Sequence, residues 1–307
     1  MTTRTDDTDT GLAAFECERR RLFGIAYRML GSVRDAEDVL QEAYVRWHGV
    51  DHAAVENPAA YLTRVVTRLC IDALQAANER RIDYMGPWLP EPLIEDAAHP
   101  SAPDPESLQE LADDLSTGFL LILERLNPVE RAVFLLHEAF GMRYREIAPV
   151  VGKSVPNCRQ IGHRARERLG DAGRARPADP AEHDRLLNRF LAATREGDVD
   201  ALLETLADDV TAYGDGGGKT AAARRPVRGS ANVARYVVGL ASKLDDAGAR
   251  VRLAAVNGRT GILTYLEDRL YAVSSLETAN GRVWRIFTVV NPDKLPTPAG
   301  RADASAP

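Results

Sequence analysis

The stretch that decides the fold of this chain is residues 144–169, which read YREIAPVVGKSVPNCRQIGHRARERL. Gly152 can take the left-handed backbone conformation that ends one helix, and Ser154 can accept hydrogen bonds from the free amides that begin the next. We therefore predict a short helix over 144–151, a sharp turn, and a longer helix over 155–169. Together with an apolar helix expected over 129–137, this pattern is typical of a helix-turn-helix unit.

The last of these helices has an apolar side and a strongly polar side. Residues 143–176 carry nine lysines and arginines against three acidic residues. Amide and guanidinium groups bind base edges and phosphates, so we predict DNA binding in preference to a merely solvated surface helix. Arg166 and Arg168 lie far from the helix start and are expected to contact phosphates or solvent. The apolar positions expected to face inward are Cys158, Ile161, Ala165 and Leu169, and the residues expected to read DNA are Ser154, Asn157, Arg159, Gln160, His163 and Arg164.

The composition of the whole chain limits the number of domains and the kinds of site that it can contain. The chain has 307 residues, 45% of them hydrophobic, which is enough for two or three domains with cores. Its net charge of −6 means that any nucleic-acid contact must come from a local basic patch. The three cysteines, Cys17, Cys70 and Cys158, lie far apart and predict neither a zinc site nor a disulfide framework. With no secretion signal or long apolar run, we expect a cytoplasmic protein without metal or cofactor.

Upstream of the helix-turn-helix unit, residues 12–82 predict a small all-α module. Three apolar stripes recur at helical spacing, one in each of the segments 22–30, 39–47 and 62–73. The pair Gly31-Ser32 separates the first two helices, and Asn57-Pro58 begins the third, since proline suits the first turn of a helix.

Between the two helical modules lies an acidic linker, residues 83–107. Residues 87–123 contain no lysine or arginine but many acidic residues and prolines. Such a segment is either a soluble spacer or an acidic strand that occupies a positively charged nucleic-acid channel. The helix-turn-helix module is expected to extend from 108 to 170.

Beyond residue 180 the pattern changes, and residues 180–296 predict an α+β domain. Helices are expected over 184–196, 199–208 and 231–243, followed by strands over 251–256, 261–266, 270–276 and 283–290. The dipeptides Asn257-Gly258 and Asn280-Gly281 favour tight turns between antiparallel strands. The expected architecture is a cone of helices packed on a curved antiparallel sheet.

Several motifs resemble a known family. The first module contains Ala26-Tyr27-Arg28-Met29-Leu30-Gly31-Ser32, Asp35-Ala36-Glu37-Asp38-Val39-Leu40-Gln41-Glu42 and Arg46-Trp47. It resembles region 2 of extracytoplasmic-function (ECF) RNA polymerase sigma factors, and residues 126–169 resemble region 4. The third module is similar to the SnoaL-like branch of the NTF2-like fold. The whole order resembles the ECF41 (SigJ-like) group, on the further motifs Trp88-Leu89-Pro90-Glu91-Pro92, Asp215-Gly216-Gly217-Gly218-Lys219 and Asn291-Pro292-Asp293-Lys294-Leu295.

The resemblance implies a promoter-specificity subunit, not an enzyme, which binds core RNA polymerase, recognises and melts promoter DNA and initiates transcription. Melting requires a pocket for an extruded base, which the resemblance places at about residues 48–57. On the third helix, Arg64, Thr67 and Arg68 are expected to share one side and hold single-strand phosphates, while Tyr61 either packs in the core or contacts a base. The residues expected to dock on core polymerase are Asp35, Glu37, Asp38, Gln41, Glu42 and Arg46.

The resemblance also implies that the third domain contacts the sigma regions and regulates them in cis, without a separate anti-sigma factor. From the residues alone, the glycine-rich loop and the final motif are equally well a hairpin loop and a turn at the sheet end. A phosphate-binding loop is excluded, because Tyr213 stands where the Walker pattern needs its first glycine. The expected regulatory contacts are Trp88, Leu89, Pro90, Asp215, Gly216, Gly217, Gly218, Lys219, Asn291, Pro292, Asp293 and Lys294.

Two other classes of function compete with this interpretation. One is a one-component regulator that binds duplex DNA and senses a metabolite in the third domain. The other is an isomerase or cyclase, for which an acid–base pair would be needed. His183, the only histidine after Gly170, is expected on the polar side of its helix, which argues against catalysis.

Overall fold

The computed structural model describes residues 3–80, 84–95, 115–170 and 179–296. These fall into two compact units, one made of residues 1–82 and 119–174, the other of residues 83–118 and 175–307. The linker is thus part of the same unit as the carboxyl-terminal domain. The expected start of the helix-turn-helix module at residue 108 and most of the acidic linker lie outside the described residues. Among those described, no helix meets the length and apolarity that a membrane span requires.

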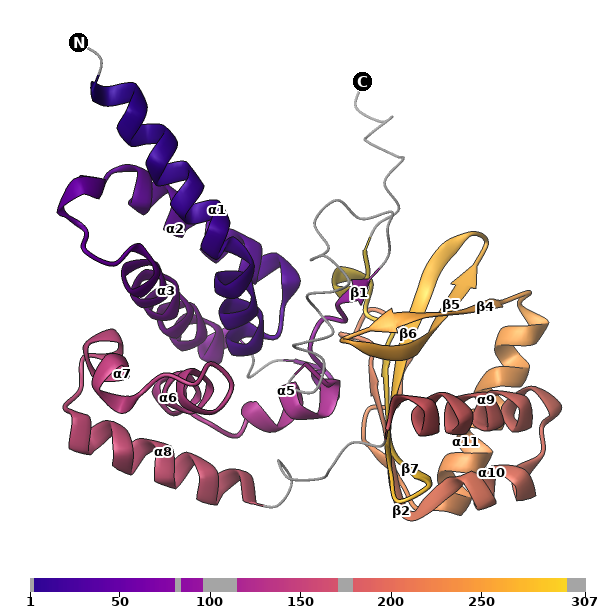
Figure 1. The fold of residues 1–307 in the computed structure, drawn as a ribbon. Helices are drawn as coiled ribbons and strands as arrows, with labels where there is room; N and C mark the ends of the chain where they lie inside the picture. The colour runs from indigo at the N-terminus through magenta and orange to yellow at the C-terminus, as the bar shows by residue number, and fades with distance from the viewer. Residues whose placement is uncertain (1–2, 81–83, 96–114, 171–178, 297–307) are drawn as a thin grey trace, which may run out of the picture. The chain divides into compact units, whose positions relative to one another are not determined.

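The first unit begins with three helices that enclose a small core (Figure 1). They are α1 (Thr3–Leu30), α2 (Val33–His48) and α3 (Pro58–Arg80), with a 3-10 turn, η1 (His52–Ala54), before α3. Ser32 caps α2 by accepting a hydrogen bond from the Asp35 amide. The Trp47 indole is buried and donates to the Gly11 carbonyl oxygen at 2.7 Å. The expected three-helix module is confirmed.

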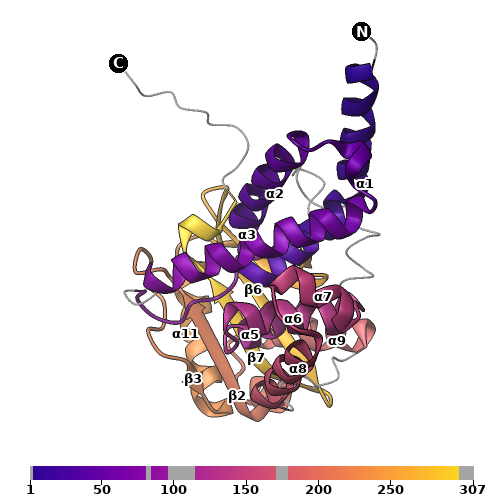
Figure 2. The same cartoon turned by 90° about the vertical axis from the view of Figure 1, so that its left-hand side faces the viewer.

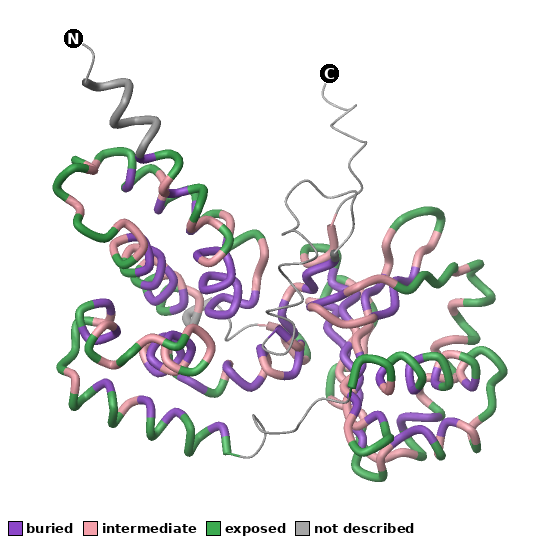
Figure 3. The backbone as a smooth tube through the Cα atoms, viewed as in Figure 1, coloured by how far each residue is buried: buried purple, intermediate pink, exposed green. Residues whose placement is uncertain are grey.

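The same unit contains the helix-turn-helix, made of α6 (Pro128–Glu138), α7 (Tyr144–Val151) and α8 (Val155–Leu169), and, from Phe119 onward, the preceding helix α5 (Thr117–Leu123). Gly152 ends α7 with a φ of 67°, and the Ser154 hydroxyl accepts from the Asn157 amide to begin α8. Buried and exposed residues alternate along α8, as Figure 3 shows. The turn chemistry expected from the sequence is therefore the chemistry that the structure uses.

Two buried arginines join these helical parts into one packed body. Arg131 of α6 is 3% exposed and donates to the Met29 carbonyl oxygen at 2.6 Å and to the Glu124 carboxylate at 2.8 Å. Arg28 of α1 is 1% exposed, and its guanidinium lies 5.2 Å from the centre of the Phe140 ring. A buried guanidinium is costly unless its donors are satisfied, so these contacts fix α1 against α6 closely.

The second unit is a seven-stranded sheet with helices on one side. Its strands lie in the order β1-β4-β5-β6-β7-β2-β3 in the described residues, and β2 runs parallel to β7 beside it (Figure 2). A long connection through one helix, α11, and four strands, β3 to β6, separates that pair in sequence, which permits the parallel arrangement. The elements are β1 (Ile94–Glu95), α9 (Pro180–Glu196), α10 (Val199–Thr205), β2 (Leu206–Asp215), β3 (Val227–Arg228), α11 (Ser230–Asp246), β4 (Arg250–Val256), β5 (Arg259–Leu266), β6 (Arg269–Ala279), β7 (Arg282–Val289) and η5 (Pro292–Lys294).

Side-chain alternation gives the sheet two distinct sides. Ile262, Leu276 and Ile286 pack under the helices, whereas Leu263 and Val273 form a second core on the opposite side. That second core also contains Ile94 of the linker, because β1 pairs with β4 in the register Ile94↔Val256. We call the first the helix side and the second the linker side.

The sequence predictions for this domain were right in class and partly wrong in detail. Asn257-Gly258 and Asn280-Gly281 form the expected turns, all four residues having positive φ. Residues 206–208 are strand and not helix, because they begin the strand β2, which was not expected. His183 is 2% exposed, not on a polar side, and its ring nitrogens lie 3.0 Å from the Thr278 hydroxyl and 2.9 Å from the Thr260 carbonyl oxygen.

Candidate functional site

The outer side of α8 is an exposed polar surface. Its inner side is held by buried Cys158, Ala165 and Leu169, with Ile161 half-buried. Gly162 is also buried, and a side chain there would collide with the Tyr144 ring and hydroxyl. Every residue predicted to read DNA is exposed, namely Ser154, Asn157, Arg159, Gln160, His163 and Arg164.

Two further arginines of α8 are committed to ion pairs within the unit. Arg166 donates to the Glu138 carboxylate at 2.5 Å, and Arg168 donates to the Glu130 carboxylate at 2.6 Å. Both partners lie on α6, so these arginines fasten α8 to the helix behind it. They are less available to phosphates than Arg159 or Arg164, for which no such ion pair is found among the described residues.

Helix α3 presents fewer free groups than expected. Arg64 is exposed, but Thr67 is fully buried and therefore does not share the exposed side with its two arginine neighbours. Arg68 donates to the carbonyl oxygens of Val150 at 3.0 Å and Pro149 at 3.2 Å, at the end of α7. Tyr61 is half-buried, with its ring centre 5.5 Å from that of Trp47. In this arrangement only Arg64 of the three predicted phosphate contacts is free for DNA.

Five of the six residues predicted to dock on core polymerase lie exposed on α2. Asp35, Asp38, Gln41, Glu42 and Arg46 are exposed, and Glu42 pairs with Arg46 at 2.9 Å. The sixth residue, Glu37, is half-buried and pairs with Arg19 of α1 at 2.8 Å.

An apolar residue that sequence analysis missed lies on the same side of α2. Val45 is 66% exposed, one turn beyond Gln41 and Glu42. Its position in the middle of a polar helix surface is the signal that could have identified it as an exposed member of that surface.

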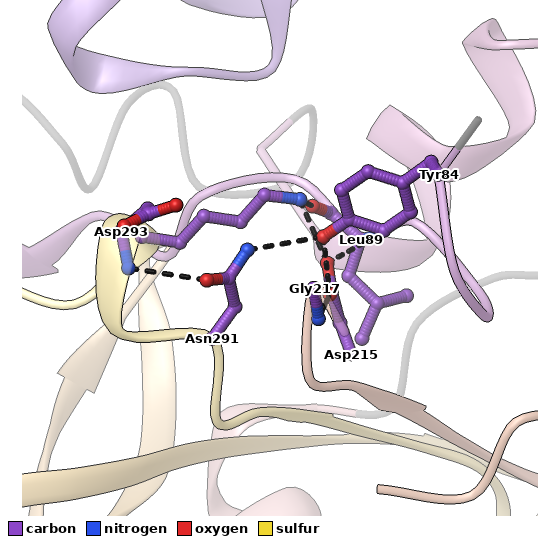
Figure 4. A network of polar contacts seen from close by, with 7 residues as sticks. Tyr84, Leu89, Asp215, Gly217, Asn291 and Asp293 are labelled. Carbon is purple, nitrogen blue, oxygen red and sulfur yellow. Dashed lines mark hydrogen bonds and ion pairs between the residues drawn. The ribbon is translucent and has the colours of Figure 1, made fainter. Parts of the chain in front are cut away.

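A buried carboxylate joins the three motifs predicted to act together. Asp215, fully buried at the end of β2, accepts hydrogen bonds from the Tyr84 hydroxyl at 2.5 Å and the Leu89 amide at 2.9 Å (Figure 4). Lys294 lies 2.7 Å from the same carboxylate and also donates to the Leu89 carbonyl oxygen at 2.5 Å. Asn291 donates to the Tyr84 hydroxyl at 3.1 Å. We call this network, by which Asp215, Asn291 and Lys294 hold Tyr84 and Leu89, the first anchor.

Aromatic rings close around the lysine of the first anchor. The Lys294 ammonium lies 4.3 Å from the centre of the Trp88 ring and 5.1 Å from that of Tyr84. Burial and the neighbouring Asp215 carboxylate raise the pKa of the Tyr84 hydroxyl well above its ordinary value. Tyr84 therefore donates as a neutral phenol, and the cation of Lys294 balances the anion of Asp215.

The glycine-rich motif shapes the first anchor through its backbone. Gly217 and Gly218 have φ values of 59° and 73°. A side chain at Gly217 would collide with the amide group of Asn291, and one at Gly218 would come within 3.3 Å of Met85. The Gly217 amide also donates to Asp215 at 3.0 Å. Glycine is required here because the backbone turns tightly beneath the linker.

The remaining predicted contacts lie around this network. Leu89 and Pro90 are buried, Trp88 is half-buried, and Pro292 is exposed. Lys219 and Asp293 form an exposed ion pair at 2.6 Å across the two motifs. Gly216 accepts, through its carbonyl oxygen, the amides of Lys219 and Thr220. The structure thus brings together all three motifs, and adds Tyr84, which lies four residues before Trp88 and which the sequence did not single out.

A second contact that sequence analysis missed holds residues 116–118, which lead into α5 and end the stretch 83–118 that belongs to the second unit. We count this whole stretch as the linker in the structure. Glu277 of β6 accepts from the Ser116 hydroxyl at 3.4 Å and from the Gly118 amide, and Arg285 of β7 lies 3.3 Å from its carboxylate. The hydroxyls of Thr117 and Ser275 lie 3.0 Å apart. We call the contacts of Ser275, Glu277 and Arg285 with residues 116–118 the second anchor.

The second anchor has its own electrostatic character. The Glu277 side chain is only 16% exposed, and burial raises its pKa despite the opposing effect of Arg285. A side chain at Gly118 would collide with the Glu277 carboxylate. The signal in the sequence is a pair of opposite charges, Glu277 and Arg285, at facing positions of two adjacent strands.

Comparisons with known proteins agree with this arrangement. The chain matches the Sigma-70 region 2 family over residues 14–80, the Sigma-70 region 4 family over 118–169 and the SnoaL-like domain family over 187–291. It is similar to the ECF RNA polymerase sigma factor SigJ of Mycobacterium tuberculosis, with 37% identity over 92% of this chain and 93% of that protein. It is also similar to the probable ECF RNA polymerase sigma factor SigI of that species, with 32% identity over 92% and 94%. The crystal structure of Mycobacterium tuberculosis SigJ covers 92% of this chain and 97% of its own, with a TM-score of 0.74 and 35% identity.

Proposed function

Because the chain belongs to the ECF sigma factors, with sigma regions 2 and 4 followed by a SnoaL-like domain, we propose that this last domain regulates initiation in cis by holding the linker. As a sigma factor the protein directs core RNA polymerase to promoter DNA. While the SnoaL-like domain holds the linker, regions 2 and 4 cannot separate far enough to engage both promoter elements. When the domain releases the linker, they can. We propose that the fused domain takes the place of a separate anti-sigma protein and acts in the cytoplasm beside its polymerase.

The observation that carries this proposal is the first anchor. Tyr84 follows α3, the last helix of region 2, by four residues, and Asp215 and Lys294 hold it and Leu89 against the domain. Asp215 is fully buried and Lys294 is 13% exposed, so neither charge is available to solvent while the linker is bound. A held linker limits how far region 4 can move from region 2, and a released one removes that limit.

The test is transcription in vitro with purified core polymerase and the full chain. Asp215→Asn and Lys294→Met each break the charge balance of the first anchor, and we expect both to raise promoter output at least threefold. Asp209→Asn is the matched control, because Asp209 is an exposed aspartate on the same strand. Unchanged output from both anchor variants, or equal output from the control, would overturn the proposal. Transcription without core polymerase would contradict the sigma mechanism itself.

For promoter recognition, we propose that the exposed residues of α8 read the upstream element. A side chain that pairs with a base contributes about 1–3 kcal/mol of discrimination. We expect Arg159→Ala to lower output at the cognate promoter about tenfold or more. Arg166→Ala is its control, since Arg166 is paired with Glu138, and should change output less than about threefold. Equal losses in both variants would reject direct reading by Arg159.

For melting and docking, we propose that Arg64 and Arg68 of α3 hold the opened strand and that the exposed side of α2 binds the polymerase. Arg68 reaches DNA only after it leaves the carbonyl oxygens of α7. Thr67, being buried, is not among the proposed contacts in this arrangement. Val45→Asp tests the α2 surface, and we expect weaker binding to core polymerase in a direct binding assay. Unchanged affinity would remove α2 from the docking surface.

A further inference from the structure

A glycine interrupts the inner side of α8, the helix proposed above to read the upstream element. Gly162 is buried in the middle of this helix, between the buried residues Cys158 and Ala165. Glycine is less favourable than alanine inside a helix, because its backbone has more freedom to lose on folding. The φ of Gly162 is not positive, so a left-handed conformation does not explain the glycine. The reason lies instead in the space that its neighbours leave.

The ring of Tyr144 occupies the space that a side chain at position 162 would need. A Cβ atom there would lie 2.7 Å from the Tyr144 hydroxyl oxygen, 3.2 Å from Cε1 and 3.3 Å from Cζ. Carbon atoms that are not bonded prefer to lie about 3.5–4.0 Å apart. The outer end of the tyrosine ring therefore rests directly on the backbone of α8, and only glycine at position 162 permits this contact without a shift.

The Tyr144 ring has little freedom to move away from α8. It stacks on the His137 ring of α6, with the ring centres 4.1 Å apart. His137 is itself held, because its Nδ1 lies 2.9 Å from the Met142 carbonyl oxygen. The Tyr144 hydroxyl lies 3.4 Å from the guanidinium of Arg166, which is paired with Glu138 of α6. Tyr144, the first residue of α7, thus contacts both α6 and α8, and a displacement of its ring would disturb both sets of contacts.

We propose that the contact between Tyr144 and Gly162 sets how closely α8 lies against α7, and that both are positioning residues for promoter recognition. Arg159 and His163, two of the residues predicted to read DNA, are exposed and lie within one turn of Gly162. Hydrogen bonds to base edges need donor–acceptor distances of about 2.7–3.2 Å, so a small shift of α8 breaks them. This inference deepens the proposed reading of the upstream element by α8 and rests on it.

The test measures how well the holoenzyme discriminates between upstream elements. A promoter is selected from a library randomised in that element, and its output in vitro is divided by the output of a promoter with the element scrambled. In Gly162→Ala the methyl group pushes α8 away from Tyr144. We expect the ratio to fall about fivefold or more, the size of one lost base contact, while affinity for core polymerase stays within about twofold of the parent's.

The matched control is Gly239→Ala. Gly239 is also inside a helix, α11, but a methyl group there meets nothing within 4 Å, and the helix belongs to the carboxyl-terminal domain. We expect the discrimination ratio of this variant to equal that of the parent. An equal fall in both variants would overturn the positioning role.

A second substitution shows whether the two residues act through their contact. The Tyr144 hydroxyl oxygen is the atom nearest to the added methyl group, so Tyr144→Phe relieves the collision. We expect Gly162→Ala combined with Tyr144→Phe to recover at least half of the ratio that Gly162→Ala loses. Additive losses from the two substitutions would overturn the proposal. If Gly162→Ala does not fold, Tyr144→Leu tests the same contact from α7, and a ratio equal to the parent's would then overturn it.

The parent protein separates this inference from the proposed function. A parent that does not discriminate between upstream elements, or whose discrimination survives Arg159→Ala, rejects reading by α8 and the inference with it. If the parent discriminates and loses this ability in Arg159→Ala, an unchanged ratio in Gly162→Ala overturns the positioning role alone. That holds even if total output or the melting temperature falls, because such losses would show a contact that only stabilises the fold.

Discussion

The two ends of the linker are held to the same side of the sheet by different chemistry. In the first anchor the Asp215 anion meets the Lys294 cation and two linker donors, and the rings of Trp88 and Tyr84 lie close to that cation. In the second anchor Glu277 meets Arg285 at 3.3 Å, yet burial still raises its pKa. The first anchor therefore depends on its charges, whereas the second is favoured when its carboxyl group is neutral.

Removing the carboxylate of the first anchor should have the largest effect. Asp215→Ala leaves Lys294 as a nearly buried cation without an anion and the Leu89 amide without an acceptor. Breaking one partner of a buried ion pair costs about 3–5 kcal/mol. We expect a loss of that order in the free energy of unfolding, measured by urea denaturation.

The control for this variant is Asp209→Ala, an exposed aspartate on the same strand, expected to stay within about 0.5 kcal/mol of the parent. A loss below about 1 kcal/mol for Asp215→Ala would mean that the first anchor is no stronger than a surface ion pair, and the contrast between the anchors would disappear.

The next effect should come from the backbone of the glycine-rich motif. Gly217→Ala forces a left-handed conformation on alanine and pushes its methyl group into Asn291, at a cost of about 1–3 kcal/mol. Gly239→Ala on α11 is the control, since a methyl group there meets nothing within 4 Å and alanine favours a helix. Thermal unfolding measures both, and equal melting temperatures for the two variants would contradict this account.

Local features of the structure were easier to predict from the sequence than contacts between distant residues. The helix-turn-helix was predictable because Gly152 and Ser154 act locally, within a few residues of the helices that they separate. In each anchor the linker residues lie more than 120 residues from the domain residues that hold them, so the motifs indicated that Asp215 and Lys294 matter but not which linker atoms they hold. The strand β2 was missed because its polar start, Asp208-Asp209, resembles the end of a helix.

Burial of Thr67 was also beyond the sequence. Helical spacing placed it beside Arg64 and Arg68, but threonine suits both a buried and an exposed position, and only the packing of α3 decides between them. Likewise, Arg68 was expected to be available for DNA. In the structure it donates to carbonyl oxygens at the end of α7, which have no partner inside that helix because the helix ends there.

A smaller effect is expected at the second anchor from Gly118→Ala. The added methyl group displaces the Glu277 carboxylate, which loses its bonds to Ser116 and the Gly118 amide. We expect the free energy of unfolding to fall by about 1–2 kcal/mol. Amide exchange should become faster at residues 115–118 and stay unchanged at residues 84–94. Combining Gly118→Ala with Glu277→Ala should restore part of the lost free energy of unfolding, because the methyl group at position 118 then no longer collides with a carboxylate at position 277. Strictly additive losses in the double variant would show that the two residues do not interact.

The smallest effect, and the one that separates the anchors most directly, is the pH dependence of Glu277. Burial raises its pKa in the folded protein, so its contribution to stability is fully present below the ordinary value of 4.5 and is lost as the pH rises through the raised value. Glu277→Gln keeps the shape of the neutral acid at every pH. We expect the variant to equal the parent near pH 4 and to exceed it by about 1 kcal/mol or less near pH 8, measured as urea midpoints. If the parent instead gains stability over the variant as the pH rises, the Arg285 ion pair outweighs burial, and both anchors would depend on charge.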